Sequence, residues 1–333
     1  MEKPKTYINR QVLMHHSSNN NLPKSRQWPL FGYLIGMTAL VAITYLYFVD
    51  IPVHIELIFF ALFVVATGIP HGAVDHIVAA DVYKLNQNYK DQLKFYGTYL
   101  IVMACLGALW IVSPISGFVV FMITSIYHFG QGDLNWVSSS LKSKTYLRAL
   151  FVSRGIVLIV IPVVYHWQVT APIIESASGF DITYIHWLVD HALYIAVIAL
   201  LQHMMLMLGL IGKIKTRFIV QEYSLVIILA FLFFIANPLV SFALYFGIWH
   251  SLNHFFELRD HLSLKNNSTD SFFNLYKHTV PFTIISLIGL VLLWYILGAA
   301  GVKDQMISVL FILISVLTLP HMLLINQMYD KKI

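Results

Sequence analysis

The chain has 333 residues, of which 58% are hydrophobic and only 11% are charged, and its mean hydropathy is +0.73. This composition excludes a soluble globular protein and predicts an all-α, polytopic integral membrane protein built as a helix bundle. The formal net charge of +5 does not indicate a nucleic-acid partner, because the basic residues are spread over short loops between apolar runs.

Residues 1–27 are polar and basic and are expected to form a disordered cytoplasmic tail, ahead of a single transmembrane domain at 28–333. Apolar runs separated by turn residues predict about 8–10 transmembrane helices after this tail. The ten expected runs cover residues 29–49, 53–69, 95–112, 115–130, 149–167, 182–211, 222–236, 239–258, 279–299 and 305–328. Where only a proline-containing turn divides two runs, fewer and broken helices are the alternative.

Lysine and arginine residues lie in the tail, in every second expected loop and at the C-terminus. Only Arg154 and Lys303 fall outside these segments. Because cytoplasmic loops carry an excess of basic residues, this alternation favours ten helices with both termini in the cytoplasm. Arg154 lies inside an apolar run, and we expect it to be a structural counter-ion or to snorkel toward the membrane interface.

This topology brings several histidines to one depth, in the cytoplasmic half of their helices. Ionisable groups at membrane depth are costly in free energy, so they mark candidate functional sites. The single Cys105 excludes a metal site built from cysteines, which leaves imidazole as the abundant ligand among 15 histidines. We therefore predict a metal centre built from histidines of different helices. Those at the shared depth are His71, His76, His128, His250, His254 and His321.

Motif spacing narrows this set to four ligands. In GIPHGAVDH, at 68–76, Pro70 removes a backbone donor and Gly72 permits close approach, so the helix is expected to change direction and present His71 inward. His250 and His254 are four residues apart and share one helix face. Neutral imidazoles suit iron, zinc, copper or nickel. The predicted metal ligands are His71, His128, His250 and His254.

Other polar residues close to these motifs are expected to orient the ligands. A ligating imidazole usually gives its second N–H to a carboxylate or a carbonyl. The candidates for this role are Asp75, His76, Asp133 and His321. An equally favoured interpretation of Asp75 and Asp133 is that they cap helix ends. For His186, His191 and His203, hydrogen-bonded packing is the favoured interpretation.

Four segments carry these polar residues: PHGAVDH at 70–76, YHFGQGD at 127–133, WHSLNH at 249–254 and TLPH at 318–321. Together they resemble the Brp/Blh family, the bacterioopsin-related proteins, which are bacterial and archaeal β-carotene 15,15′-dioxygenases. The resemblance extends from the second expected helix to the last, and PHGAVDH is its most specific part. The residues before 28 lie outside the pattern, and we assign them no catalytic role.

The resemblance implies that 28–333 is a catalytic domain in the bacterial or archaeal cell membrane. Such an enzyme uses non-haem Fe²⁺ and O₂ to split the central double bond of β-carotene into two all-trans-retinal molecules. The resemblance also implies that the iron ligands and catalytic residues are His71, His128, His250 and His254. A rhodopsin apoprotein would be an indirect partner, as the consumer of retinal.

A long apolar polyene must be recognised by shape and apolar contact rather than by hydrogen bonds. We expect a tunnel between helices, open to the lipid bilayer, with aromatic residues around the paired histidines as its wall. Individually, ordinary packing is the favoured interpretation of these aromatic residues. The candidates are Phe242, Tyr245, Phe246, Trp249, Phe255 and Phe256.

Two other functions remain open at this point. A membrane di-iron desaturase or hydroxylase is also rich in histidine, but it needs more histidine boxes, and the only adjacent pair here is His15-His16 in the polar tail. A non-enzymatic carotenoid-binding or transport protein would use its intramembrane histidines for packing or proton relay. Metal content separates the three classes: one iron per chain indicates the dioxygenase, two the desaturase and none the carrier.

Overall fold

The computed structural model describes residues 28–47, 51–86, 88–263, 272–299 and 306–330. The expected polar tail at 1–27 lies outside these residues. The described part is helical and contains no β-strand, which confirms the all-α class. Its first half contains α1 (Trp28–Tyr47), α2 (Val53–Phe63), η1 (Val64–Gly68), α3 (Ile69–Ala73), α4 (Asp75–Val82), α5 (Tyr89–Val112), α6 (Pro114–Leu134), η2 (Asn135–Ser140) and α7 (Lys144–Tyr165).

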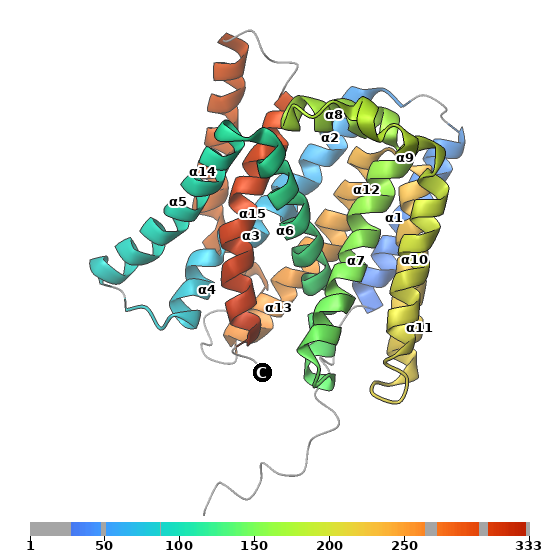
Figure 1. Ribbon diagram of the computed structural model, residues 1–333. Helices are drawn as coiled ribbons and strands as arrows, with labels where there is room; N and C mark the ends of the chain where they lie inside the picture. The colour runs from blue at the N-terminus through green and yellow to red at the C-terminus, as the bar shows by residue number, and fades with distance from the viewer. Residues whose placement is uncertain (1–27, 48–50, 87, 264–271, 300–305, 331–333) are drawn as a thin grey trace, which may run out of the picture.

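The second half continues the bundle (Figure 1). It contains α8 (Trp167–Ser178), η3 (Ile182–Ile185), α9 (Trp187–Asp190), α10 (Ala192–Leu208), α11 (Thr216–Ile235), α12 (Pro238–Leu244), η4 (Tyr245–Ser251), α13 (Leu252–Ser263), α14 (Phe272–Ala299) and α15 (Met306–Asp330). Helix α8 was not expected, and it runs across one end of the bundle instead of along it. Its buried residues include Trp167 and Ala171, so it covers that end.

Six helical segments of the described chain are long and apolar enough to cross a membrane, or seven if the pair at 182–208, bent by 74°, is one span. The protein is therefore a polytopic integral membrane protein. This number is below the 8–10 expected for two reasons. Helix α6 and the α12–α13 segment carry polar residues that lower their hydropathy, and the apolar part of α1, Phe31–Tyr47, is at the short end of the length that crosses a bilayer. The six segments are Val53–Val82, Tyr89–Val112, Lys144–Tyr165, Thr216–Ile235, Phe272–Ile296 and Ile307–Asp330.

Helices α6 and α7 form the tightest helix pair of the bundle. A Cβ atom on Gly155 would overlap the carbonyl oxygen of Ile126, and one on Gly130 would overlap the carbonyl oxygen of Phe151. Both positions therefore require glycine, and the two backbones touch. This contact fixes α6, which carries His128 and Asp133, against α7, which carries Arg154.

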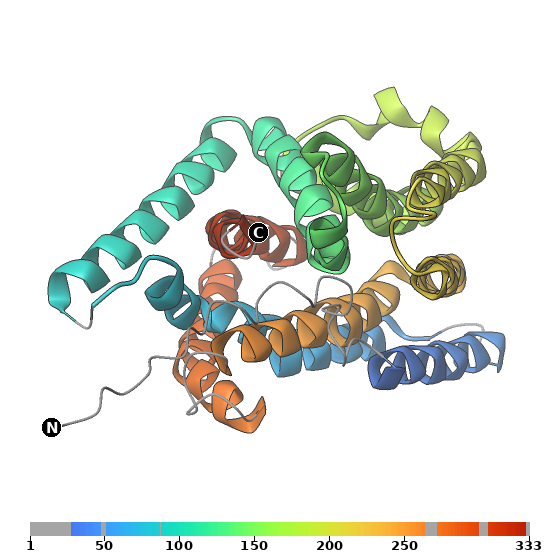
Figure 2. The same cartoon turned by 90° about the horizontal axis from the view of Figure 1, so that it is seen from below.

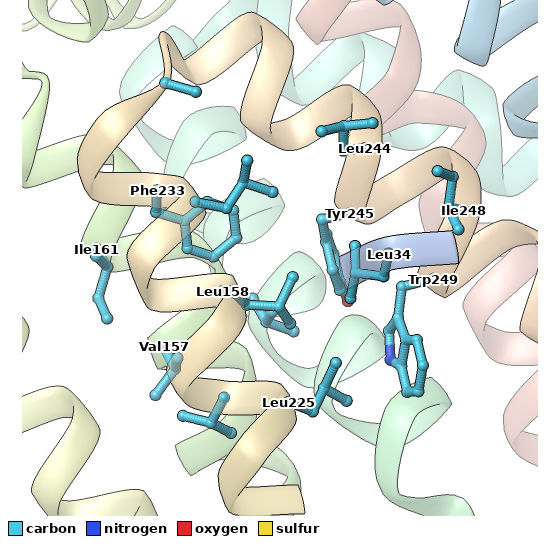
Figure 3. Close-up of a cluster of buried hydrophobic side chains, with 14 of the residues drawn as sticks. Leu34, Val157, Leu158, Ile161, Leu225, Phe233, Leu244, Tyr245, Ile248 and Trp249 are labelled. Atoms are coloured by element: carbon cyan, nitrogen blue, oxygen red, sulfur yellow. The ribbon is translucent and has the colours of Figure 1, made fainter. Parts of the chain in front are cut away.

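The main apolar core joins α1, α7, α10, α11 and the α12–η4 segment (Figure 3). Leu34, Leu158 and Phe233 are fully buried there, and Tyr245 and Trp249 of η4 pack among them. A second cluster joins α4, α13 and α15 through residues such as Val78, Leu258 and Met328. Helix α15 lies between α5 and α6 (Figure 2).

Candidate metal centre

Two π-helical segments shape the backbone around the predicted ligands. Segment η1 ends immediately before the α3 helix of His71, and η4 contains His250. The two segments pack against each other. A Cβ on Gly68 would lie 2.5 Å from the Phe246 ring, so this crossing also requires glycine. Val74 separates α3 from α4 within the expected range, and the π-helical turns lie upstream of Pro70, but Val53–Val82 still forms one candidate span.

Five histidines of the described chain converge at this crossing, and all five are buried. They are His71 on α3, His128 on α6, His250 on η4, His254 on α13 and His321 on α15. The His128 ring centroid lies 5.1 Å from that of His250, and the His71 centroid lies 5.7 Å from it. The His254 centroid lies 6.0 Å from that of His71 and 5.7 Å from that of His321. These five histidines, which the topology placed at one membrane depth, are therefore also close to one another in space.

Three of these side chains are close enough to hold one ion. One ring nitrogen from each of His71, His128 and His250 lies within 4.8 Å of the other two. Two imidazole nitrogens that bind one ion at about 2.1 Å each lie at most about 4.2 Å apart. Small side-chain shifts would therefore bring the three nitrogens into a common coordination sphere.

Hydrogen bonding at the rings fits a metal site. The His71 Nδ1–H donates to the carbonyl of Gly68, which leaves its Nε2 lone pair for a ligand. The Nδ1 atom of His128 and the Nε2 atoms of His250 and His321 are buried and have no hydrogen-bond partner among the described residues. Buried polar atoms normally have one. A cation surrounded by imidazoles would satisfy these lone pairs, so the residues present fit a transition metal.

Asp75 contacts one of the five histidines directly. Its Oδ1 lies 2.8 Å from His321 Nδ1, and its Oδ2 accepts a 2.8 Å hydrogen bond from the Tyr99 hydroxyl of α5. The Asp75 side chain thus bridges two other helices, which is not the contact of a helix cap. Tyr99 was not predicted, because 24 residues separate it from Asp75 and no motif links them.

Asp133 belongs to a larger buried network. Its Oδ1 lies 3.8 Å from His250 Nδ1 and accepts a 3.3 Å hydrogen bond from the Tyr245 hydroxyl. Its Oδ2 lies 3.2 Å from Arg154, whose Nη1 lies 3.2 Å from Glu222 Oε1. Arg154 is fully buried, so it is a counter-ion and does not snorkel. Asp133 therefore connects the histidines to a charge network that reaches α11.

The other histidines lie elsewhere. His76 is partly buried, and its ring packs against Phe282 at 4.5 Å. His186 and His191 are exposed. His203 is fully buried at the far end of the Asp133 network, where its Nδ1 lies 2.8 Å from Ser153 Oγ and its Nε2 lies 3.5 Å from Glu222.

The predicted aromatic wall divides into two groups. Phe246 stacks on His250 at 5.9 Å and meets His71 edge-on at 5.4 Å, and Phe242 stacks on Phe246. Phe129, which was not among the predicted residues, lies 4.7 Å from His250. Tyr245 joins the Asp133 network, as described above.

The remaining wall candidates face other parts of the bundle. Trp249 packs in the main core (Figure 3). Phe255 and Phe256 pack against Phe272 of α14, at 5.0 and 5.3 Å. The aromatic surface that borders the histidines is therefore formed by Phe129, Phe242 and Phe246.

Two comparisons with known proteins match most of this chain. The family model described as "Beta-carotene 15,15'-dioxygenase" matches residues 62–329, a range that includes all five clustered histidines. The protein named "Beta-carotene 15,15'-dioxygenase" from uncultured marine bacterium 66A03 is 25% identical over 278 residues, which cover 80% of this chain and 91% of that protein. No solved structure matches the chain.

Proposed function

Because the chain belongs to the β-carotene 15,15′-dioxygenase family, we propose that it cleaves β-carotene at the central 15,15′ double bond with O₂. The overall reaction converts one β-carotene and one O₂ into two molecules of all-trans-retinal, which balances carbon, hydrogen and oxygen. The observation that supports this activity most directly is the convergence of five buried imidazoles within the matched region.

We propose that His71, His128, His250 and His254 hold Fe²⁺. Imidazole suits this ion, and the unpartnered ring nitrogens of His128 and His250 support the assignment. Bound iron would supply the redox chemistry that lets O₂ oxidise an alkene. The protein's own contribution is to fix the imidazoles: the Gly68 carbonyl holds the Nδ1–H of His71 and so directs the Nε2 lone pair to the ion.

The substrate's chemistry fits the surroundings of the histidines. β-Carotene is dissolved in the bilayer and offers no hydrogen-bonding group, so its recognition must rest on apolar contact and shape. Phe129, Phe242 and Phe246 supply aromatic surface beside the histidines. We propose that these rings place the middle of the polyene beside the metal and keep water away from it.

We propose a cellular setting from the charge distribution along the chain and from the family resemblance. The lysines and arginines in alternate loops favour both termini in the cytoplasm. The family resemblance suggests the cell membrane of a bacterium or archaeon as the location of the bundle. Retinal would leave into the bilayer, where a rhodopsin apoprotein could consume it.

Expression in cells that accumulate β-carotene tests the activity. We expect the cells to lose their orange colour, and chromatography of extracted pigments should show all-trans-retinal in a molar ratio approaching two per β-carotene lost. Cells that express a variant with alanine at the three positions His71, His128 and His250 provide the control. Undiminished β-carotene with the wild-type chain present in the membrane would contradict the proposal.

A further inference from the structure

His321 was expected only to orient the ligands, but it lies among them. Its ring centroid is 5.2 Å from those of His71 and His128 and 5.7 Å from that of His254. These separations are as short as those among the four proposed ligands. Helix α15 reaches the site from between α5 and α6, so His321 approaches the cluster from a helix that carries none of the other four.

The two ring nitrogens of His321 have different surroundings. Nδ1 lies 2.8 Å from Asp75 Oδ1, whereas Nε2 is buried and has no hydrogen-bond partner in the part of the chain that the structure describes. An ionised carboxylate only accepts hydrogen bonds, so the proton of a neutral His321 ring lies on Nδ1. The lone pair then lies on Nε2, on a ring whose neighbours include the imidazoles of His71, His128 and His254.

Asp75 is itself held in place from another helix. The hydroxyl of Tyr99 donates a 2.8 Å hydrogen bond to Asp75 Oδ2, so both carboxylate oxygens have a partner. A carboxylate that holds the Nδ1–H of an imidazole whose Nε2 is available is the common arrangement behind a metal-bound histidine. A histidine that only packed in the bundle would be expected to have both nitrogens hydrogen-bonded.

We propose that His321 is a fifth imidazole ligand of the metal, and that Asp75 and Tyr99 are positioning residues that fix its ring orientation and tautomer. This inference rests on the proposed iron-dependent function and extends its ligand set. It differs from the ligand set implied by sequence resemblance, which contains no residue of α15.

The test compares iron binding in the purified wild type and in His321→Ala, with His186→Ala as the matched control, because His186 is exposed and lies outside the cluster. X-ray absorption of the iron-loaded proteins reports the number of imidazole ligands. We expect that number to be five in the wild type and in His186→Ala, and to fall by one in His321→Ala. Iron affinity should fall by more than about 10-fold in His321→Ala, and added free imidazole should restore part of it.

The variant Asp75→Asn tests whether Asp75 orients His321 rather than binding the metal itself. This variant should keep the full number of imidazoles while its iron affinity falls by about 10- to 100-fold. Four imidazoles in a wild type that binds iron and produces retinal would overturn the inference and leave the proposed function intact. The same conclusion would follow if His321→Ala kept the wild-type affinity and ligand number. A wild type that binds no iron would instead refute the proposed function and this inference together. Because the wild-type spectrum decides the ligand number, the test does not depend on the folding of any variant.

Discussion

Arg154 and Asp133 form an ion pair inside the helix bundle, with Nε and Nη2 of the guanidinium both 3.2 Å from Asp133 Oδ2. Their side chains are 0% and 2% exposed. The same guanidinium lies 3.2 Å from Glu222 Oε1, so one cation faces two carboxylates. Because Asp133 also faces His250, this arrangement links the stability of the bundle to the geometry of the metal centre.

Removing the cation should destabilise the protein strongly. Arg154→Met would leave the carboxylates of Asp133 and Glu222 buried without their shared cation, and breaking a buried pair costs about 3–5 kcal/mol. We expect a marked fall in the thermal unfolding midpoint in detergent, measured by fluorescence-detected size exclusion after heating. The control is Arg217→Met, because Arg217 is exposed and its loss should change stability by less than about 0.5 kcal/mol. Equal midpoints for the two variants would contradict a structural role for Arg154.

Each of the four proposed ligands should be required for activity. We expect His71→Ala, His128→Ala, His250→Ala and His254→Ala to abolish retinal formation while the chain remains in the membrane, because each change removes one imidazole from the ion. Pigment chromatography measures the product, and detection of the chain in washed membranes measures insertion. His191→Ala is the comparison, since His191 is exposed and its Nδ1 contacts only the Trp187 carbonyl. If one of these variants retains wild-type activity in iron-loaded membranes, the substituted histidine is not an iron ligand.

Several parts of this arrangement could be predicted from sequence because they depend on local pattern. The apolar runs, the basic loops and the polar motifs at 70–76, 127–133, 249–254 and 318–321 identified the class and placed six histidines at one depth. Five of them lie in the cluster, and His76 does not. The convergence of His71, His128 and His250 followed from that depth.

The remaining features depend on which helices pack together. Tyr99 of α5 contacts Asp75, and Glu222 of α11 contacts Arg154. Neither residue lies in one of the four sequence motifs. The faces on which Trp249, Phe255 and Phe256 lie could not be predicted from their spacing, although ordinary packing was the interpretation favoured for each ring. A regular helix has 3.6 residues per turn, so each residue added to a turn rotates the following side chains by about 100°. The π-helical segment η4 therefore moves these rings to faces that a regular helix would not give them.

Metal removal should abolish activity reversibly. The hydrogen bonds at the rings are consistent with lone pairs directed at a cation, and a chelator should therefore inactivate the purified protein. We expect Fe²⁺ to restore retinal formation and Zn²⁺ not to restore it, because zinc binds imidazole but has no redox chemistry. Elemental analysis should give one iron per chain. Two irons per chain would favour a di-iron desaturase or hydroxylase, and full activity without metal would contradict the proposed mechanism.

Phe246 should control how the polyene lies beside the metal. Its ring stacks on His250 and meets His71 edge-on, yet it has no atom that can bind an ion. Phe246→Ala should therefore keep iron at the wild-type ratio and lower kcat/KM for β-carotene by about 10- to 200-fold, the range that lost apolar contact supports. Phe256→Ala removes a ring of the same size that packs against Phe272, away from the histidines, and should lower kcat/KM much less. Since both variants lose aromatic packing, equal losses of kcat/KM would show that stability rather than substrate contact is responsible. A larger loss in Phe246→Ala, with iron content unchanged, would place the substrate against this face of η4.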